Sequence, residues 1–188
     1  QYYSAGFDGY TFQWYPAGLG KSDINRMNML PMLDDYEIFW EDDPEFQKAA
    51  RLAYEFDVTN VDRSYLYTQM ARKFREKEFQ FITQFSYDSL PLSGYNSEYP
   101  QQYLNFAYTP AKAIGFKIAA EAFRHFKRGE KMDLYPENLK AGPLRIVPDE
   151  DLVEWRTDQK YFYSANTDSK PDSSNSLKHI AGTGSSPL

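Results

Sequence analysis

The first two thirds of the chain alternate between β-type and α-type hydrophobic patterns. Residues 7–15, 51–56 and 79–85 are short runs rich in aromatic and other apolar side chains, as expected for β-strands. Residues 59–76 and 109–127 instead repeat apolar side chains every three or four positions, which predicts amphipathic helices. Strands and helices that alternate in this way favour a parallel sheet covered by helices.

Helix boundaries carry their own signals. Asp43 and Pro44 form an acidic N-cap followed by a proline in the first helical position, which predicts a short helix before the second strand. Thr109 and Pro110 open the predicted helix over 109–127, and Gly129 follows its basic end.

The pattern weakens after about residue 130. The acidic run in 147–155 predicts a short helix, with Asp149–Asp151 in its first turn, and 160–165 reads as a strand. Residues 164–176 are mostly Ser, Asn, Asp, Thr and Lys, which is typical of a linker or an exposed loop. We therefore expect one domain over 1–163, and a linker or the start of a C-terminal β-rich domain over 164–188.

Composition and charge narrow the possible functions. The net charge is −6 and the basic residues are scattered, which argues against a nucleic-acid surface. No apolar run approaches the ~20 residues of a membrane helix, so we expect no membrane span. The chain has no cysteine, and neither His125 nor His179 has a spacing that suggests a metal. We expect no cofactor and no metal, and acid–base chemistry would rely on carboxylates.

Aromatic residues reach 18% of the chain, with 16 Tyr, 14 Phe and 3 Trp. Such rings can stack on the apolar faces of sugars while a hydroxyl or indole N–H forms hydrogen bonds. Tyr-rich packing is the simpler explanation for most of them.

The carboxyl ends of the three predicted strands carry the candidate functional residues, because parallel α/β barrels place their active sites there. These residues are Trp14 and Tyr15 after the first strand, Glu55 and Asp57 at the second, and Tyr87 and Asp88 after the third.

Several blocks of the sequence resemble a known family. "DGYTFQWYPAGL", "ARLAYEFDVTNVDRSYLYTQMARKFR", "FQFITQFSYD", "NSEYPQQYLNFAYTPAKAIGFKIAAEAF" and "LKHIAGTGSSP" occur in this order and are similar to consecutive blocks of β-galactosidase-like glycoside hydrolases of clan A. That resemblance covers most of the chain and is weakest over 21–42. It implies the C-terminal half of a (β/α)8 TIM-type barrel, an α/β fold in which the three strands are the sixth, seventh and eighth. The tail after about residue 164 would then lead into a β-rich domain.

The resemblance also implies an activity and a place in the cell. Clan A enzymes carry a nucleophilic glutamate at the end of the seventh strand, the position of Glu55 in "YEFD". Their acid/base glutamate ends the fourth strand, to which nothing in this chain corresponds. The implied function is a retaining glycosidase acting on a β-linked, galactoside-like oligosaccharide or polysaccharide in the periplasm or outside the cell. The remainder of the barrel would come from the same parent protein, so we expect the isolated chain to be inactive.

Each candidate has a simpler explanation. Glu55 could pair with Arg51 or Arg63, and Asp57 could be a helix cap or a salt-bridge group. Trp14, flanked by Gln13 and Tyr15, could be a sugar-stacking platform or an ordinary packing residue.

Two further groups of candidates lie beyond the third strand. Tyr87 and Asp88 could line the subsite that holds the reacting sugar. Glu98 could bind a sugar hydroxyl or cap the segment that follows it.

A second hypothesis belongs to a different functional class. A non-catalytic carbohydrate-binding or glycan-capture protein would have a similar aromatic content, with helices from a repeat scaffold. A parallel arrangement of the three strands favours the enzyme, whereas helix pairs without a parallel sheet would exclude it.

Overall fold

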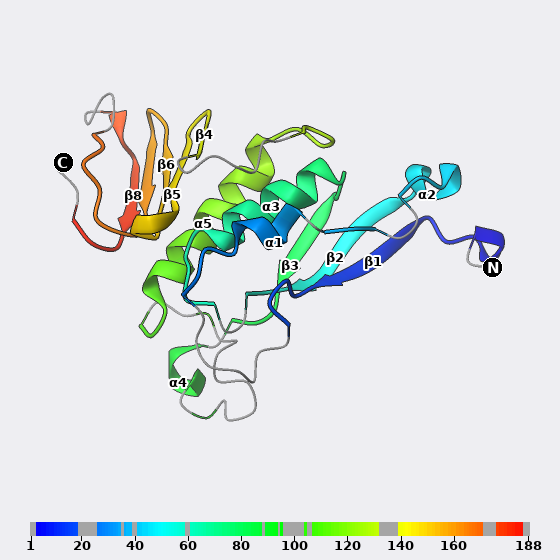
Figure 1. Ribbon diagram of the computed structural model, residues 1–188, viewed down its shortest axis with the longest axis horizontal. Helices are drawn as coiled ribbons and strands as arrows, with labels where there is room; N and C mark the ends of the chain where they lie inside the picture. Colours follow the sequence, from blue (N-terminus) through cyan, green and yellow to red (C-terminus); the bar gives the residue numbers. More distant parts are fainter. Residues whose placement is uncertain are drawn as a thin grey trace.

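Two β-sheets with the two longest helices between them form the bulk of the described part of the chain (Figure 1). The computed structural model describes residues 3–18, 26–34, 36–38, 41–58, 61–87, 89–93, 95, 104, 107–131, 139–170 and 176–185. Its helices are α1 (Leu30–Asp34), α2 (Pro44–Lys48), α3 (Leu66–Glu76), α4 (Leu90–Ser93) and α5 (Pro110–His125), with single 3-10 turns η1 (Tyr3–Ala5) and η2 (Pro148–Glu150). The strands are β1 (Gly9–Trp14), β2 (Ala50–Phe56), β3 (Phe81–Gln84), β4 (Leu139–Ala141), β5 (Leu144–Val147), β6 (Leu152–Arg156), β7 (Lys160–Tyr163) and β8 (His179–Gly182).

The first sheet has the order β1-β2-β3, and both of its strand pairs are parallel. The expectation of an α/β unit with three parallel strands is thus confirmed, although three strands do not make a complete barrel. Both signals that predicted the start of α2 are present. Asp43 is the N-cap and accepts hydrogen bonds from first-turn N–H groups, and Pro44 is the first helical residue. Helix α3 begins at Leu66, later than the predicted start at Thr59 or Asn60, which lie outside the described residues.

Aromatic packing joins this sheet to its helices. Phe56 of β2 is fully buried, and its ring meets the rings of Tyr67 and Phe74 on α3 and of Phe116 on α5. Much of the aromatic content is therefore core, as the simpler explanation expected.

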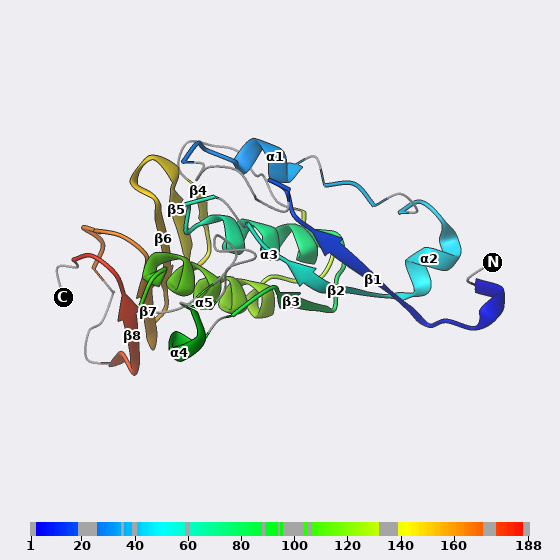
Figure 2. The ribbon, with the colours of Figure 1, turned by 90° about the horizontal axis from the view of Figure 1, so that it is seen from below.

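The second sheet has the order β4-β5-β6-β7-β8 and is mixed, because β7 and β8 are parallel and the other pairs antiparallel. One face packs against α5 through alternate apolar residues such as Ile146, Val153 and Trp155, all of which are buried. Figure 2 shows α3 and α5 between the two sheets.

The expected helix over 147–155 is wrong. Only η2 is helical there, and β6 follows it at once. Asp151 takes a left-handed conformation with φ of 50° and ends the acidic turn. Leu152 and Val153, which follow it, are the first residues of β6 and are fully buried. The apolar pairing of the strand outweighed the acidic signal for a helix start.

The second sheet also extends across the predicted boundary after residue 163, because β7 ends at Tyr163 and pairs with β8. A β-rich region follows the parallel unit, but it begins at Leu139 with β4.

A buried hydrogen-bond cluster connects the second sheet to the start of α3. The Ser64 N–H donates to Asp151 Oδ1 at 2.7 Å, and the Ser64 hydroxyl donates to the Asp151 carbonyl at 2.7 Å. Ser64 and Ser164 hydroxyls are 2.7 Å apart, and Ser164 Oγ accepts the Val153 N–H at 2.9 Å. Because Ser64 belongs to the segment between β2 and α3, the second sheet holds the connection that follows Glu55.

The helices in the described part of the chain all fall short of the length and apolar character that a membrane span requires.

Candidate active site

Glu55 lies next to the end of β2, the middle strand of the parallel sheet. A β-bulge in β2 sets its direction. Phe12 of β1 is opposite Ala53, but the next residue, Gln13, is opposite Glu55, so Tyr54 is an extra residue in β2. Pairing with β3 shows the same shift. Bulges near functional sites re-aim side chains, and here Ala53 and Phe56 remain fully buried while Tyr54 is 50% exposed.

Two side chains of the neighbouring strand end hold the Glu55 carboxylate. Gln13 Nε2 donates to Glu55 Oε1, and the Tyr15 hydroxyl donates to the same oxygen at 2.8 Å. Within the part of the chain that the structure describes, no hydrogen bond reaches Oε2. The carboxylate is thus oriented through one oxygen and open at the other, and this arrangement suits a group that must attack or bind a ligand.

Tyr15 acts as a donor to Glu55. Its own burial, followed by the hydrogen bond to Glu55 and the negative charge there, raises the pKa of Tyr15 well above its ordinary value. The phenol therefore keeps its proton at neutral pH, and Glu55 receives a neutral O–H donor.

Neither arginine proposed as a simple partner pairs with Glu55. Arg51 is buried, donates to the Lys77 carbonyl at 2.8 Å and lies 3.5 Å from the Glu78 carboxylate. Arg63 donates to the Arg26 carbonyl.

Trp14 is a packing residue, and the expectation of a sugar-stacking platform is wrong for it. The indole is only 8% exposed, stacks on Tyr36 with ring centroids 4.1 Å apart, and meets the edge of Phe74 at 5.3 Å. Because β1 alternates, its side chain points into the core while Gln13 points out.

The remaining candidates are not joined to this group. Tyr87 follows β3, is 58% exposed, and forms an isolated parallel bridge with Leu104. Among the described residues, no hydrogen bond connects Tyr87 to Glu55 or its partners. Asp88 and Glu98 lie outside the described residues.

Asp57 belongs to a buried polar cluster that the sequence did not reveal. Its carboxylate is fully buried and accepts the Val58 N–H at 2.8 Å and the Tyr67 hydroxyl. The Lys112 ammonium, buried on α5, donates to the Val58 carbonyl at 3.0 Å. This cluster ties the end of β2 to both helices behind it, so Asp57 is neither a helix cap nor a surface ion-pair group.

Burial shifts the titration of all three groups in the cluster. It raises the pKa of Asp57 to about 6, although the positive charge of Lys112 and the Tyr67 hydrogen bond act in the opposite direction. Burial and the neighbouring Asp57 charge raise the pKa of Tyr67, and burial lowers that of Lys112. The one sequence signal was Lys112 itself, a lysine on the same helix face as Gly115 and Ala119.

Within the described ranges, no group of three or more His, Asp or Glu side chains is placed to hold a metal ion. No protein-family model matches the chain, and neither a curated protein nor a solved structure matches it.

Proposed function

We propose that this chain is the nucleophile-bearing part of a retaining glycoside hydrolase that cleaves a β-linked, galactoside-like carbohydrate. The observation that supports this proposal is the Glu55 carboxylate, held at the end of the middle parallel strand by Gln13 and Tyr15. Chain resemblance to the clan A enzymes suggested the same residue.

Retention requires two carboxyl groups about 5–5.5 Å apart, one of which attacks the anomeric carbon while the other protonates the leaving oxygen. Glu55 would form the covalent glycosyl-enzyme through its open oxygen, Oε2. Water then attacks the intermediate, with the second carboxyl acting as base. Tyr15 and Gln13 would orient the nucleophile and, once its bond to the sugar breaks, stabilise the returning negative charge.

The second carboxyl would come from the remainder of the barrel in the parent protein. Parallel sheets are normally covered on both faces, whereas α3 and α5 cover one face of β1–β3, and Tyr54 of the middle strand is half exposed. An apolar groove of about 160 Å³ beside β3, lined by Phe81, Ile82, Phe116 and Phe123 among others, offers a further contact surface for adjoining barrel elements.

The alternative of a non-catalytic glycan-binding protein predicted helix pairs without a parallel sheet. Parallel pairing of β1, β2 and β3 supports the enzyme over that alternative, and the burial of Trp14 removes one of the aromatic platforms it would use.

The test uses the parent protein that contains this chain and a panel of aryl β-glycosides. We expect Glu55→Gln to lower kcat by at least about 10⁴-fold, because a neutral amide cannot replace the nucleophile. Glu45→Gln is the matched control, since that exposed glutamate forms an ion pair with Lys48 on α2, away from Glu55. The activity of this variant should equal that of the wild type. Full activity in Glu55→Gln would refute the assignment.

A further inference from the structure

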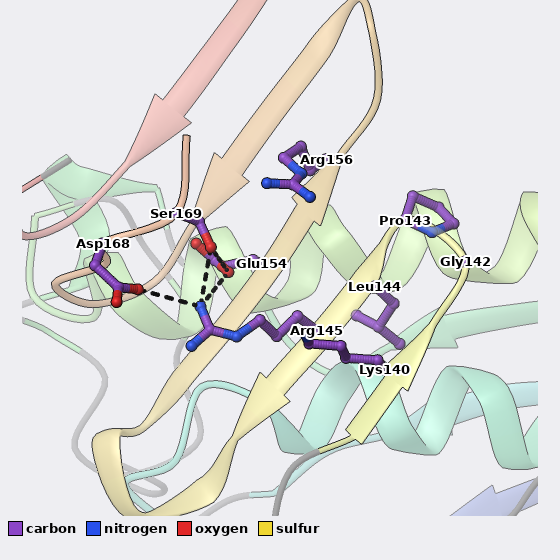
Figure 3. Close-up of a pocket in the computed structure, with 9 residues that line it drawn as sticks. All are labelled: Lys140, Gly142, Pro143, Leu144, Arg145, Glu154, Arg156, Asp168 and Ser169. Carbon is purple, nitrogen blue, oxygen red and sulfur yellow. Dashed lines mark hydrogen bonds and ion pairs between the residues drawn. The ribbon is translucent and has the colours of Figure 1, made fainter. Parts of the chain in front are cut away.

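The second sheet has a polar cavity on the face turned away from α5 (Figure 3). Its volume is about 520 Å³, which is in the range of small-ligand sites. The residues that line it are Lys140, Gly142, Pro143, Leu144, Arg145, Glu154, Arg156, Asp168 and Ser169. None of these nine is aromatic, so a ligand here would be recognised by charge and hydrogen bonds rather than by stacking.

A row of charged residues crosses the floor of this cavity. Lys140 of β4 pairs in register with Arg145 of β5, and Arg145 pairs in register with Glu154 of β6. Like charges directly opposite on paired strands destabilise a sheet. Lys140 and Arg145 therefore place two positive charges side by side in this row.

The Glu154 carboxylate offsets the charge of Arg145, and both of its oxygens are already occupied by hydrogen bonds. It is 2% exposed, and its Oε1 accepts the hydroxyls of Thr167 and Tyr161. Its Oε2 accepts Arg145 Nη1 at 2.8 Å and the Ser169 hydroxyl at 3.1 Å.

Arg145 keeps one edge of its guanidinium unused. Its Nη1 donates hydrogen bonds to Glu154 and Ser169. The same nitrogen lies 3.8 Å from the Asp168 carboxylate, an ion pair that solvent screens because Asp168 is 95% exposed. Among the described residues, no hydrogen bond reaches Nε or Nη2 of Arg145, and no acidic side chain pairs with Lys140. The cavity lining carries three cations against two carboxylates, with Arg156 as the third positive charge; its Nη1 donates to the Lys170 carbonyl at 2.6 Å.

We infer that this cavity binds an oxyanion, a carboxylate, sulfate or phosphate group, between Lys140 and the open edge of Arg145. A planar guanidinium edge binds two oxygens of such a group at once, and an ammonium adds a point charge beside it. The bound anion would contact both cations at once. The site is on the opposite side of α5 from Glu55 and does not depend on the proposed glycosidase activity.

The experiment is an isothermal titration of the 188-residue chain at low ionic strength with four probes: inorganic sulfate, inorganic phosphate, galacturonate and neutral galactose. We expect the anions to bind and galactose not to bind at this site. Similar affinity for sulfate, phosphate and galacturonate would identify the ligand as a free oxyanion. Tighter binding of galacturonate would identify it as the acidic group of a saccharide.

Variants localise the binding. Lys140→Gln removes an exposed ammonium without unpairing Glu154, and should weaken anion binding about tenfold, as expected for one charge-assisted hydrogen bond. Lys178→Gln, an exposed lysine next to β8 and outside the cavity, removes the same charge and should leave affinity unchanged. Arg145→Lys, which keeps the charge but loses the planar edge, should also weaken binding. Absence of anion binding, or equal losses in Lys140→Gln and Lys178→Gln, would overturn the inference.

Discussion

Tyr15 and Glu55 meet at the ends of two adjacent parallel strands, with 2.8 Å between the Tyr15 hydroxyl and Glu55 Oε1. Forty residues separate them in sequence, and the extra residue in β2 is what turns Glu55 toward the end of β1.

If this hydrogen bond orients the nucleophile, Tyr15→Phe should lower kcat of the parent glycosidase by about 10- to 100-fold, because a hydrogen bond to a charged group contributes about 1.5–3 kcal/mol. KM should change little. Tyr54→Phe is the control, since Tyr54 is a half-exposed neighbour. Steady-state kinetics on an aryl β-glycoside make the comparison, and wild-type kcat in Tyr15→Phe would contradict the orienting role.

Burial of Asp57 predicts a specific pH dependence of stability. Its folded pKa of about 6 lies above the unfolded value of about 3.9, so its contribution is fully present below about pH 4 and is lost as the pH rises through 6. That loss is about 2–3 kcal/mol. Asp57→Asn abolishes it, and the unfolding free energy of the variant relative to the wild type should rise by that amount between pH 4 and pH 7.

Urea denaturation at both pH values measures this difference. Asp62→Asn serves as the control, because Asp62 is an exposed partner of Arg26, and its difference from the wild type should stay within about 0.5 kcal/mol. A pH-independent difference for Asp57→Asn would show that the buried carboxyl does not titrate in this range.

The hydroxyls of Ser64 and Ser164 should be energetically coupled. Each buried serine has more than one hydrogen-bond partner, so Ser64→Ala and Ser164→Ala should each cost about 1–3 kcal/mol. The double variant should cost less than the sum by about 1 kcal/mol. Urea unfolding of the four proteins completes the cycle, with exposed Ser185→Ala as a control, and strict additivity would contradict a shared cluster.

Gly115 should not tolerate alanine. A Cβ built there would lie 2.0 Å from the Ser64 carbonyl oxygen, whereas Gly→Ala inside a helix ordinarily stabilises by about 1 kcal/mol. We expect Gly115→Ala to destabilise the chain by about 3 kcal/mol, because α5 must move away from the segment before α3. Thermal unfolding shows whether the variant is less or more stable than the wild type, and a higher Tm in the variant would refute this close packing.

Periodicity predicted the parallel unit well. The strands around Thr11, Ala53 and Ile82 and the long helix through Ile118 were predicted, because each carries a local hydrophobic pattern. Glu55 could be placed at a strand end for the same reason.

Features that depend on pairing between distant segments could not be read from the sequence. The bulge at Tyr54 reverses which side chains face outward, and only the register with β1 reveals it. Trp14 could be read from the sequence as an exposed platform, because its stacking on Tyr36 depends on a distant segment of the chain. Lys112 and Asp57 are buried because α5 packs on the end of β2, and their charges would otherwise predict exposure.

The central claim, that Glu55 is the nucleophile, is tested most directly by trapping its covalent intermediate. A 2-deoxy-2-fluoro β-glycoside with a good leaving group slows breakdown of the glycosyl-enzyme, so the parent protein can be digested and its labelled peptide identified by mass spectrometry. We predict one fluoroglycosyl group on the peptide spanning 52–63, attached to Glu55, and no labelling in Glu55→Gln. A label on a different carboxylate, or labelling of Glu55→Gln at the wild-type rate, would contradict the account.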